Sequence, residues 1–318
     1  MDAAEVDMGR KIVCIGLGLV LLAGILAGCG APAQQGEGAK LRVVASIFPV
    51  YDFARAVAGG LAQVEMLIAP GASIHAYDPS PADIRTLHQA DLFLYIGGES
   101  DVWADRLLAS LEPSGRAALR LMDCVRPLRE ERKDGMQGGA GDGGYDEHIW
   151  TSPKNAVLLV EAICGAMCEA DPGNAAAYRD NAAAYQAQLE QLDGEITELI
   201  AHAKRKMIVV ADRFPFLYFV RDYGLDYAAA FPGCSEESDA DPGTLLYLIQ
   251  TAKRERVPYI YYVELSNPGL AEMVAKQAGA GVLPLHSCHN VTREAFDKGV
   301  TYVSLMGQNI GNLRKGLY

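Results

Sequence analysis

Positive charge is scarce in this sequence. The 318 residues include 28 lysines and arginines against 40 aspartates and glutamates, which leaves a formal net charge of −12 at pH 7. A protein of that charge repels the phosphates of nucleic acids, so a nucleic-acid-binding function is excluded. The same charge suits a cationic ligand.

A hydrophobic run long enough to cross a membrane is also missing. The uncharged run over residues 12–27 falls short of the ~20 apolar residues that a transmembrane helix needs. Basic residues precede this run and the motif LAGC, residues 26–29, ends it, an order typical of a secretory signal peptide. LAGC resembles the lipobox of bacterial lipoproteins, which implies cleavage before Cys29 and acylation of that cysteine. We therefore expect a signal peptide over residues 1–28 and an extracytoplasmic protein anchored to the cell membrane by lipid.

Motifs of common enzymes are absent as well. The chain contains neither the HExxH motif of zinc proteases nor the GxSxG motif of serine hydrolases. Gly139, Gly141 and Gly144 have the spacing of a dinucleotide-binding loop. No predicted strand directly precedes them and no predicted helix directly follows, so we interpret them as a Gly-rich loop and not as a dinucleotide-binding motif. We expect a binding protein rather than an enzyme.

What is present is an alternation of strands and helices. The runs LRVVASIF (residues 41–48), QVEMLIAP and DLFLYIGG are typical of buried strands, and helical segments separate them. After a flexible tether over residues 29–40, this alternation predicts an N-terminal α/β lobe with a parallel sheet over residues 41–173 (the N-lobe). The alternation resumes with MIVVAD and predicts a second α/β lobe over residues 207–318 (the C-lobe).

A long helical segment separates the two lobes. Residues 174–206 contain no proline, are rich in Ala, Leu, Glu and Gln, and carry a stripe of Tyr and Leu at helical spacing. A continuous helix of that length measures ~50 Å. The predicted architecture is therefore two Rossmann-like lobes bridged by one long helix, with a ligand cleft between the lobes.

Histidine is scarce, with six in the chain. His88 and His202 lie in helical patterns among charged neighbours, where solvated surface positions are expected. His75, His148 and His286 lie instead in loops near the ends of predicted strands. In open α/β sheets, ligands bind outside the carboxyl ends of the strands. We therefore expect these three histidines to converge in the cleft.

Segments along nearly the whole mature chain resemble one known family. In order, they are SIFPVYDFARAVAG, GASIHAYDPSPADIRTLHQADLFLYIG, DEHIWTSPKNAV, NAAAYRDNAAAYQAQLEQLD, YFVRDYGL and GVTYVSLMGQNIGNLRKGL. They resemble the zinc/manganese-binding solute receptors of bacterial ABC transporters, whose lobes are bridged by a single long helix. The resemblance implies a monomeric receptor that captures a divalent metal and delivers it to an ABC permease.

The resemblance also implies a ligand set. His75 and His148 occupy the first two ligand positions, both in the N-lobe. The third position falls in RFPFLYF and holds Arg213, whose guanidinium stays protonated and cannot coordinate a metal. The fourth position falls in LHSCHNVT, where we align His286, with His289 as a second candidate.

This ligand set favours zinc. Three imidazoles completed by water, by His289 or by the Glu264 carboxylate suit a tetrahedral Zn²⁺ site, whereas manganese prefers more oxygen ligands. Arg213 is expected to pair with Asp212 or Glu264, or to bind an anion that accompanies the metal. Three alternatives stay open: a manganese receptor, a receptor for a metal chelate or small anion, and an extracytoplasmic zinc hydrolase, since catalytic zinc sites also use three histidines.

The cysteines of the C-lobe carry one more expectation. Cys234 and Cys288 lie in loops after strands, in an oxidising compartment, and we expect them to form a disulfide. Cys164 and Cys168 are four residues apart in a helical pattern and are expected to share one helix face.

Overall fold

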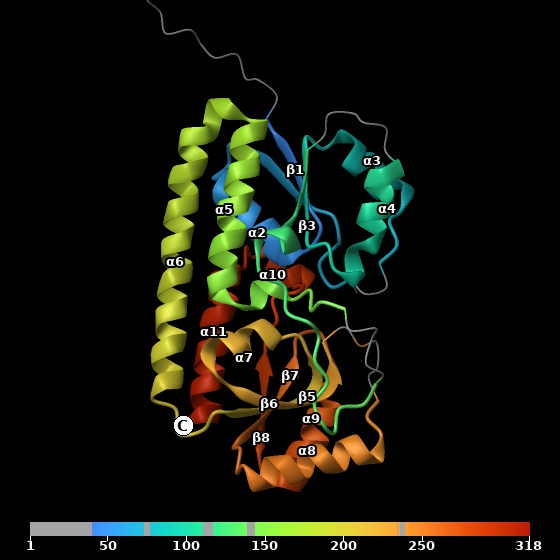
Figure 1. The fold of residues 1–318 in the computed structure, drawn as a ribbon, viewed down its shortest axis with the longest axis vertical. Coiled ribbons are helices and arrows are strands. Elements are labelled where there is room, and N and C mark those ends of the chain that lie inside the picture. Colours follow the sequence, from blue (N-terminus) through green and yellow to red (C-terminus); the bar gives the residue numbers. More distant parts are fainter. Residues whose placement is uncertain (1–39, 73–76, 111–116, 139–143, 234, 236–238) are drawn as a thin grey trace, which may run out of the picture. The chain divides into compact units, whose positions relative to one another are not determined.

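The strands of the N-lobe form one parallel sheet, as their alternation with helices predicts. The computed structural model describes residues 40–72, 77–110, 117–138, 144–233, 235 and 239–318. The N-lobe sheet has the order β2-β1-β3-β4 with every neighbouring pair parallel (Figure 1). Its strands are β1 (Arg42–Ala45), β2 (Gln63–Met66), β3 (Leu92–Tyr95) and β4 (Ala117–Arg120).

The C-lobe sheet repeats the same topology. Its order is β6-β5-β7-β8, again parallel throughout. In both sheets the chain adds its second strand on one side of the first and its third strand on the other side. Such a reversal opens a crevice at the carboxyl ends of the strands. The strands are β5 (Met207–Phe214), β6 (Asp226–Pro232), β7 (Tyr259–Val263) and β8 (Gly281–Leu285).

Helices cover both sheets, and side chains cap several of them. Ser80 and Ser152 accept hydrogen bonds from backbone N–H groups at the starts of α3 and α5, and Asp241 does so for α8. The N-lobe helices are α2 (Phe48–Ala58), α3 (Pro81–Gln89), α4 (Val102–Ser110) and α5 (Pro153–Ala170). The C-lobe helices are α7 (Leu217–Tyr223), α8 (Pro242–Arg254), α9 (Gly269–Ala278), α10 (Arg293–Asp297) and α11 (Tyr302–Leu317).

The predicted bridging helix is present as α6 (Ala175–Ala201), and Gly194 does not interrupt it. It packs along α5 and α2 of the N-lobe and against α11 and α7 of the C-lobe (Figure 1). The prediction overshoots its C-terminus by five residues. The chain leaves the helix at His202, and the Lys206 ammonium donates to the Ile200 carbonyl in the last turn, as cations at helix C-termini do.

One hydrophobic core runs through both lobes. A single buried cluster takes side chains from β1, α5, α6, β5 and α11, among them Val43, Ile163, Leu192, Val210 and Leu313. Residues Lys40–Tyr318 accordingly form one compact unit. A wide hinge motion would expose part of this core, at ~1.5–3 kcal/mol for each large side chain. We therefore expect only a small closure when a ligand binds.

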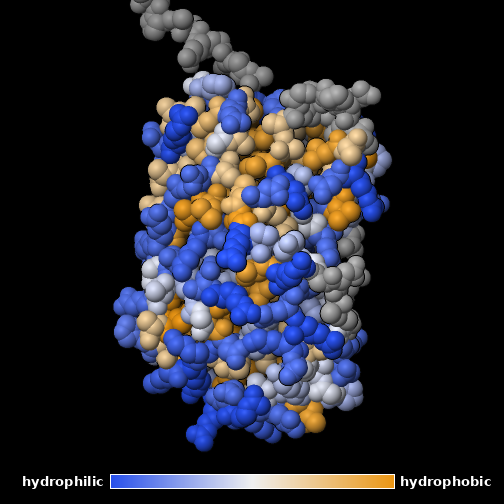
Figure 2. Space-filling model, in the orientation of Figure 1, coloured by the Kyte–Doolittle hydropathy of each residue, from blue (hydrophilic) through white to orange (hydrophobic). Residues whose placement is uncertain are grey.

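The surface is predominantly hydrophilic on the face that Figure 2 shows, with hydrophobic residues scattered between charged ones. Among the residues that the structure describes, every helix is too short or too polar to traverse a bilayer. The most exposed large apolar side chains include Leu246 on α8, Met273 on α9 and Leu265 after β7, and single exposed apolar residues are ordinary on protein surfaces.

Candidate metal site

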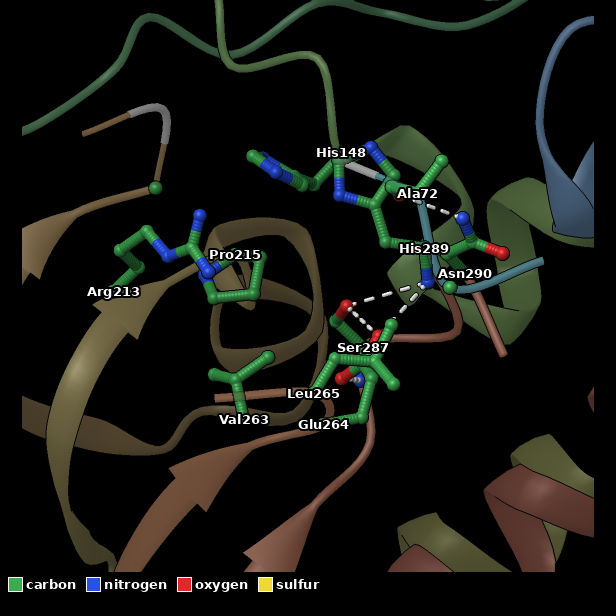
Figure 3. Close-up of a pocket in the computed structure, with 12 residues that line it drawn as sticks. Ala72, His148, Arg213, Pro215, Val263, Glu264, Leu265, Ser287, His289 and Asn290 are labelled. Carbon is green, nitrogen blue, oxygen red and sulfur yellow. Dashed lines mark hydrogen bonds between the residues drawn. The ribbon is translucent and has the colours of Figure 1, made fainter. Parts of the chain in front are cut away.

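A pocket of about 190 Å³ lies at the carboxyl ends of the C-lobe strands, where the topology predicts a crevice. All four strands of this sheet contribute to it through the residues at or just after their ends. Residues of the N-lobe, including His148, complete the wall (Figure 3). The lining residues are Gly71, Ala72, His148, Arg213, Pro215, Gly233, Val263, Glu264, Leu265, Ser287, His289 and Asn290.

His148 is fully buried, and the Asp146 carboxylate holds its ring. Asp146 Oδ1 accepts from the backbone N–H of His148 at 2.8 Å and lies 3.0 Å from His148 Nδ1. Because a carboxylate only accepts, Nδ1 carries the proton and Nε2 keeps its lone pair. A carboxylate behind a histidine in this way orients the ring and raises its basicity, as in many metal sites.

The two effects on the pKa of His148 oppose each other. Burial lowers the pKa, because the imidazolium would lose its water, while the neighbouring carboxylates, Asp146 first, raise it. The net pKa lies above the ordinary value for histidine. The ring is therefore a basic nitrogen donor, and a metal ion would compete with a proton for it.

The segment that carries His148 is anchored from both sides. Glu147 is buried and accepts from the backbone N–H of Ser100 at 2.9 Å and from the Ser100 hydroxyl. Tyr218, from α7 of the C-lobe, donates to the Asp146 carbonyl at 2.8 Å. Gly233 packs against the ring itself, since a Cβ there would lie 3.1 Å from His148 Cε1. These contacts leave the imidazole little freedom to turn.

In the C-lobe, the structure brings His289 to the pocket and keeps His286 away from it. His286 Nδ1 accepts the backbone N–H of Cys288 at 2.9 Å, so its lone pair is already used. Its backbone N–H and carbonyl are both bonded to Asn309. His286 therefore shapes the loop and is not among the residues that line the pocket, and its role as a metal ligand stays a prediction.

The turn between His286 and His289 explains why His289, and not His286, lines the pocket. Cys288 adopts φ 61°, a left-handed conformation that is uncommon for a residue with a side chain. This reversal turns His289 into the pocket, where its ring centroid lies 5.2 Å from that of His148 and 4.9 Å from that of Trp150. The two imidazoles meet nearly edge to face, at 80° (Figure 3).

Glu264 lines the pocket, but its carboxylate is engaged in holding the same turn. It accepts from the backbone N–H and hydroxyl of Ser287 at 2.6 and 2.5 Å, and from the backbone N–H of His289 at 3.1 Å. His286 Nδ1 lies 3.5 Å away, and the shorter Cys288 contact decides the role of that nitrogen. Glu264 acts as a support of the loop, which makes it a poor candidate for the fourth ligand.

Asn290 is a residue that the sequence did not single out. Its side-chain amide donates to the carbonyls of Ala69 at 3.1 Å and Ala72 at 2.8 Å. These bonds join the C-lobe loop to the N-lobe segment that leads toward His75, which itself lies outside the described residues. Trp150 adds a second connection by donating from Nε1 to the Ser287 carbonyl at 2.8 Å. Only the Asp-x-His spacing before Trp150 was visible in the sequence as a signal for Asp146.

Arg213 lines the pocket, and of its two predicted ion-pair partners it has Asp212. The end of β5 carries a bulge, with the register to β6 shifting between Val210 and Arg213, and bulges re-aim side chains next to functional sites. Arg213 Nε lies 3.8 Å from Asp212 Oδ1, and its Nη2 donates to Ser266 Oγ at 3.5 Å. Within the described part of the chain, no ion pair joins Arg213 to Glu264.

The cysteine predictions have different outcomes. Cys288 is a free, fully buried thiol in the structure, and Cys234 lies outside the described residues, so the expected disulfide gains no support. Cys29 also lies outside them. Cys164 and Cys168 share one face of α5 as expected, with their sulfurs 3.9 Å apart.

The described residues contain no group of three or more histidine, cysteine, aspartate or glutamate side chains arranged as a metal-ligand cluster. His75 is outside that set. What the structure assembles is two imidazoles from opposite lobes, with Asp146 behind one and a guanidinium beside the pair.

The fold and this pocket define a class of protein. Two parallel α/β lobes, a single long helix packed along both, and a small histidine-lined pocket between them are the features of a solute receptor. The family model described as zinc-uptake complex component A, periplasmic (ZnuA), matches residues 43–316. The chain therefore belongs to this family.

Relatives agree with the assignment. The chain is 32% identical over 286 residues to the zinc-binding lipoprotein AdcA of Streptococcus pneumoniae, covering 89% of this chain and 56% of AdcA, so it spans little more than half of that relative. It is 29% identical over 284 residues to the iron-binding protein YfeA of Yersinia pestis, covering 87% and 86%. The crystal structure of the Zn(II)-bound ZnuA-like domain of S. pneumoniae AdcA matches with a TM-score of 0.74 at 30% identity, covering 87% of this chain and 99% of that domain.

Proposed function

We propose that this protein is an extracytoplasmic receptor that captures Zn²⁺ and delivers it to an ABC importer. The observation that carries the proposal is the pair of His148 and His289, brought together from two lobes, with Asp146 behind His148. Neutral imidazoles at a buried site are ligands that Zn²⁺ prefers, typically four in a tetrahedron.

His75 is the third ligand in this proposal. Gly71 and Ala72 line the pocket, and Asn290 holds Ala69 and Ala72 by their carbonyls. The segment leading to His75 therefore starts at the rim of the pocket, which supports the assignment. Water or an exogenous group is the fourth ligand, because the Glu264 carboxylate is engaged with Ser287 and His289.

Family membership supports a receptor over the hydrolase alternative, since the family is described by its part in zinc uptake. The relatives bear on the metal in two ways. AdcA is named for zinc and YfeA for iron, so metal choice varies among relatives of this chain. Zinc is proposed here because the described donors are nitrogens, whereas Mn²⁺ favours oxygen.

The test is metal loading of the mature protein, measured by mass spectrometry and by melting curves with Zn²⁺, Mn²⁺ or chelator. A ligand at ~1,000 times its Kd stabilises the native state by ~4 kcal/mol, so zinc should raise the melting temperature by several degrees. His148→Ala should remove most of this shift.

His202→Ala is the matched control, because His202 is exposed at the end of α6. It should keep the full zinc shift. A wild-type protein that takes up no zinc, or a His148→Ala variant that loads it fully, would refute the proposal. Preferential loading of manganese would keep the receptor and change its metal.

Lipid anchoring through Cys29 is part of the same proposal. AdcA is named a lipoprotein, and the LAGC motif stands at the end of the uncharged run. Acyl chains contribute ~0.8 kcal/mol per buried CH₂ to membrane binding. In the native host, Cys29→Ser should release the protein from the membrane fraction or leave an unprocessed precursor. Normal processing and membrane retention of the variant would show that the anchor is wrong.

A further inference from the structure

The guanidinium of Arg213 is the only described cation among the residues that line the pocket. Arg213 stands at the end of β5, and its side chain reaches into the space next to His148 and His289 (Figure 3). The side chain keeps 32% of its surface exposed, so a group inside the pocket can reach its N–H donors.

The carboxylate closest to Arg213 serves mainly the backbone. Asp212 Oδ1 accepts the backbone N–H of Arg213 at 2.8 Å, and Oδ2 accepts the backbone N–H of Val263 at 3.1 Å. These bonds tie the end of β5 to β7. The guanidinium itself is 3.8 Å from Oδ1, longer than a hydrogen bond. Asp212 therefore offsets part of the positive charge of Arg213, but it does not form a hydrogen bond with the fork of N–H groups of the guanidinium.

Other described groups near the pocket do not fill the fork either. Ser266 Oγ, at 3.5 Å, is a neutral and distant acceptor. Glu264 is occupied by Ser287 and the backbone of His289. An arginine presents five donors in a planar arrangement that matches an oxyanion in bidentate fashion. Among the described residues, the anionic group paired with this guanidinium is Asp212, 3.8 Å from Nε.

A metal ion in this pocket would add further positive charge next to Arg213. The Glu264 carboxylate lines the pocket but is bonded to Ser287 and His289, and neutral imidazoles bring no negative charge. A dication held by histidines would therefore lie in the same small pocket as the guanidinium, and like charges at such short range repel each other. An anion that binds the metal and also accepts hydrogen bonds from the Arg213 guanidinium would offset this repulsion. About 190 Å³ is room for several water-sized groups, which is enough for a metal ion and a small oxyanion.

We propose that the pocket captures its divalent metal together with a small oxyanion, of the size of carbonate, phosphate or acetate, which ligates the metal and is held by Arg213. The inference rests on the proposed function and names its substrate more closely: the captured species is a metal–oxyanion pair. Arg213 is then a specificity-determining residue, and the oxyanion occupies the fourth ligand position.

The experiment measures the zinc Kd of the mature protein by competition with a zinc-binding dye, with free zinc held constant and perchlorate as the inert anion. Bicarbonate, phosphate, acetate and the larger chelator citrate are each added separately. We expect at least one of the three small oxyanions to tighten zinc binding about tenfold or more. Citrate should have the smaller effect if the anion is a free ion, and the largest effect if it enters as part of a chelate.

Arg213→Gln should abolish this anion response, and Arg213→Lys should keep part of it, because a lysine retains charge but not the fork. Arg254→Gln, at an exposed residue of α8 that pairs with Glu255, is the matched control and should respond like the wild type. Melting curves confirm that each variant is folded.

The possible results separate the inference from the function. Equal zinc affinity in every anion, or an anion response that survives in Arg213→Gln, overturns the metal–oxyanion pair and leaves the zinc receptor in place. Absence of zinc binding in all anions, perchlorate included, overturns the proposed function itself.

Discussion

The two histidine loops of the pocket use the same residue type in opposite ways. In the N-lobe, the Asp146 carboxylate accepts a hydrogen bond from Nδ1–H of His148, which leaves the lone pair of Nε2 to bind a metal. In the C-lobe, a backbone N–H takes the Nδ1 lone pair of His286, and the next histidine along the chain enters the pocket. Whether a histidine can bind a metal therefore depends on the hydrogen bond that its other ring nitrogen makes.

The supports of the two loops differ as well. The N-lobe segment is held by carboxylates and hydroxyls from its own lobe and by Tyr218 across the interface. The C-lobe loop is held by Glu264 and Asn309, and it contains a left-handed residue, Cys288. Strained backbone of this kind persists only where the surroundings determine it. The N-lobe loop therefore orients one imidazole directly, while the C-lobe loop selects which of two imidazoles faces the pocket.

The largest expected effect tests that selection. His289→Ala should weaken zinc binding about 100-fold or more, beyond the 10–100-fold that loss of an outer hydrogen-bond partner costs. His286→Asn should change the zinc Kd less than about threefold, since an asparagine oxygen can accept the Cys288 N–H and preserve the turn. Competition titration with a zinc dye measures both. Loss of binding in His286→Asn with retention in His289→Ala would reverse the comparison.

A smaller effect is expected behind His148. Asp146→Asn should weaken zinc binding about 10- to 100-fold, because the amide removes the charge that raises ring basicity and can present its NH₂ to Nδ1. The same titration measures the change. Asp123→Asn, at an exposed carboxylate paired with Arg120, provides the comparison and should bind zinc like the wild type. Unchanged zinc affinity in Asp146→Asn would mean that the Asp146 carboxylate has no part in orienting the His148 ring.

The smallest effect concerns the support of the N-lobe loop on the 3₁₀ turn η1 (Glu99–Asp101). Asp101 is buried and accepts the backbone N–H groups of Ile96 and Gly97 at 2.8 and 3.2 Å. Burial raises the pKa of Asp101 to about 6, against 3.8 for the unperturbed group. The folded state thus binds this proton more tightly than the unfolded state, so the stability contributed by protonation is lost as pH rises from about 4 to about 6.

Asp101→Asn keeps an acceptor oxygen and cannot ionise, so it should lack this slope. Relative to the wild type, the variant should gain up to ~2 kcal/mol of unfolding free energy between pH 4.5 and pH 7.5, because part of the shift of the Asp101 pKa is already expressed at pH 4.5. Urea denaturation of the metal-free proteins at three pH values measures the gain. Parallel pH profiles for the two proteins would show that Asp101 does not titrate with folding.

The sequence predicts much of the architecture, because the patterns that indicate helices and strands are local and repeat along the chain. The periodicity of residues 41–173 and 207–318 predicts two α/β lobes, and the proline-free stretch after residue 174 predicts the long helix. The end of that helix was misplaced because helical composition continues past Ala201, while the cap is made by Lys206 reaching back to a carbonyl.

The sequence by itself determined the fold class, the family resemblance and the choice of His148 as a candidate ligand. Only the tertiary structure decided that His289 and not His286 lines the pocket, that Glu264 is hydrogen-bonded within the loop, and that Arg213 pairs with Asp212 rather than Glu264. The physical reason is that these outcomes depend on the direction of single side chains. A left-handed residue at Cys288 and a bulge in β5 set those directions, and neither leaves a periodic pattern in the sequence.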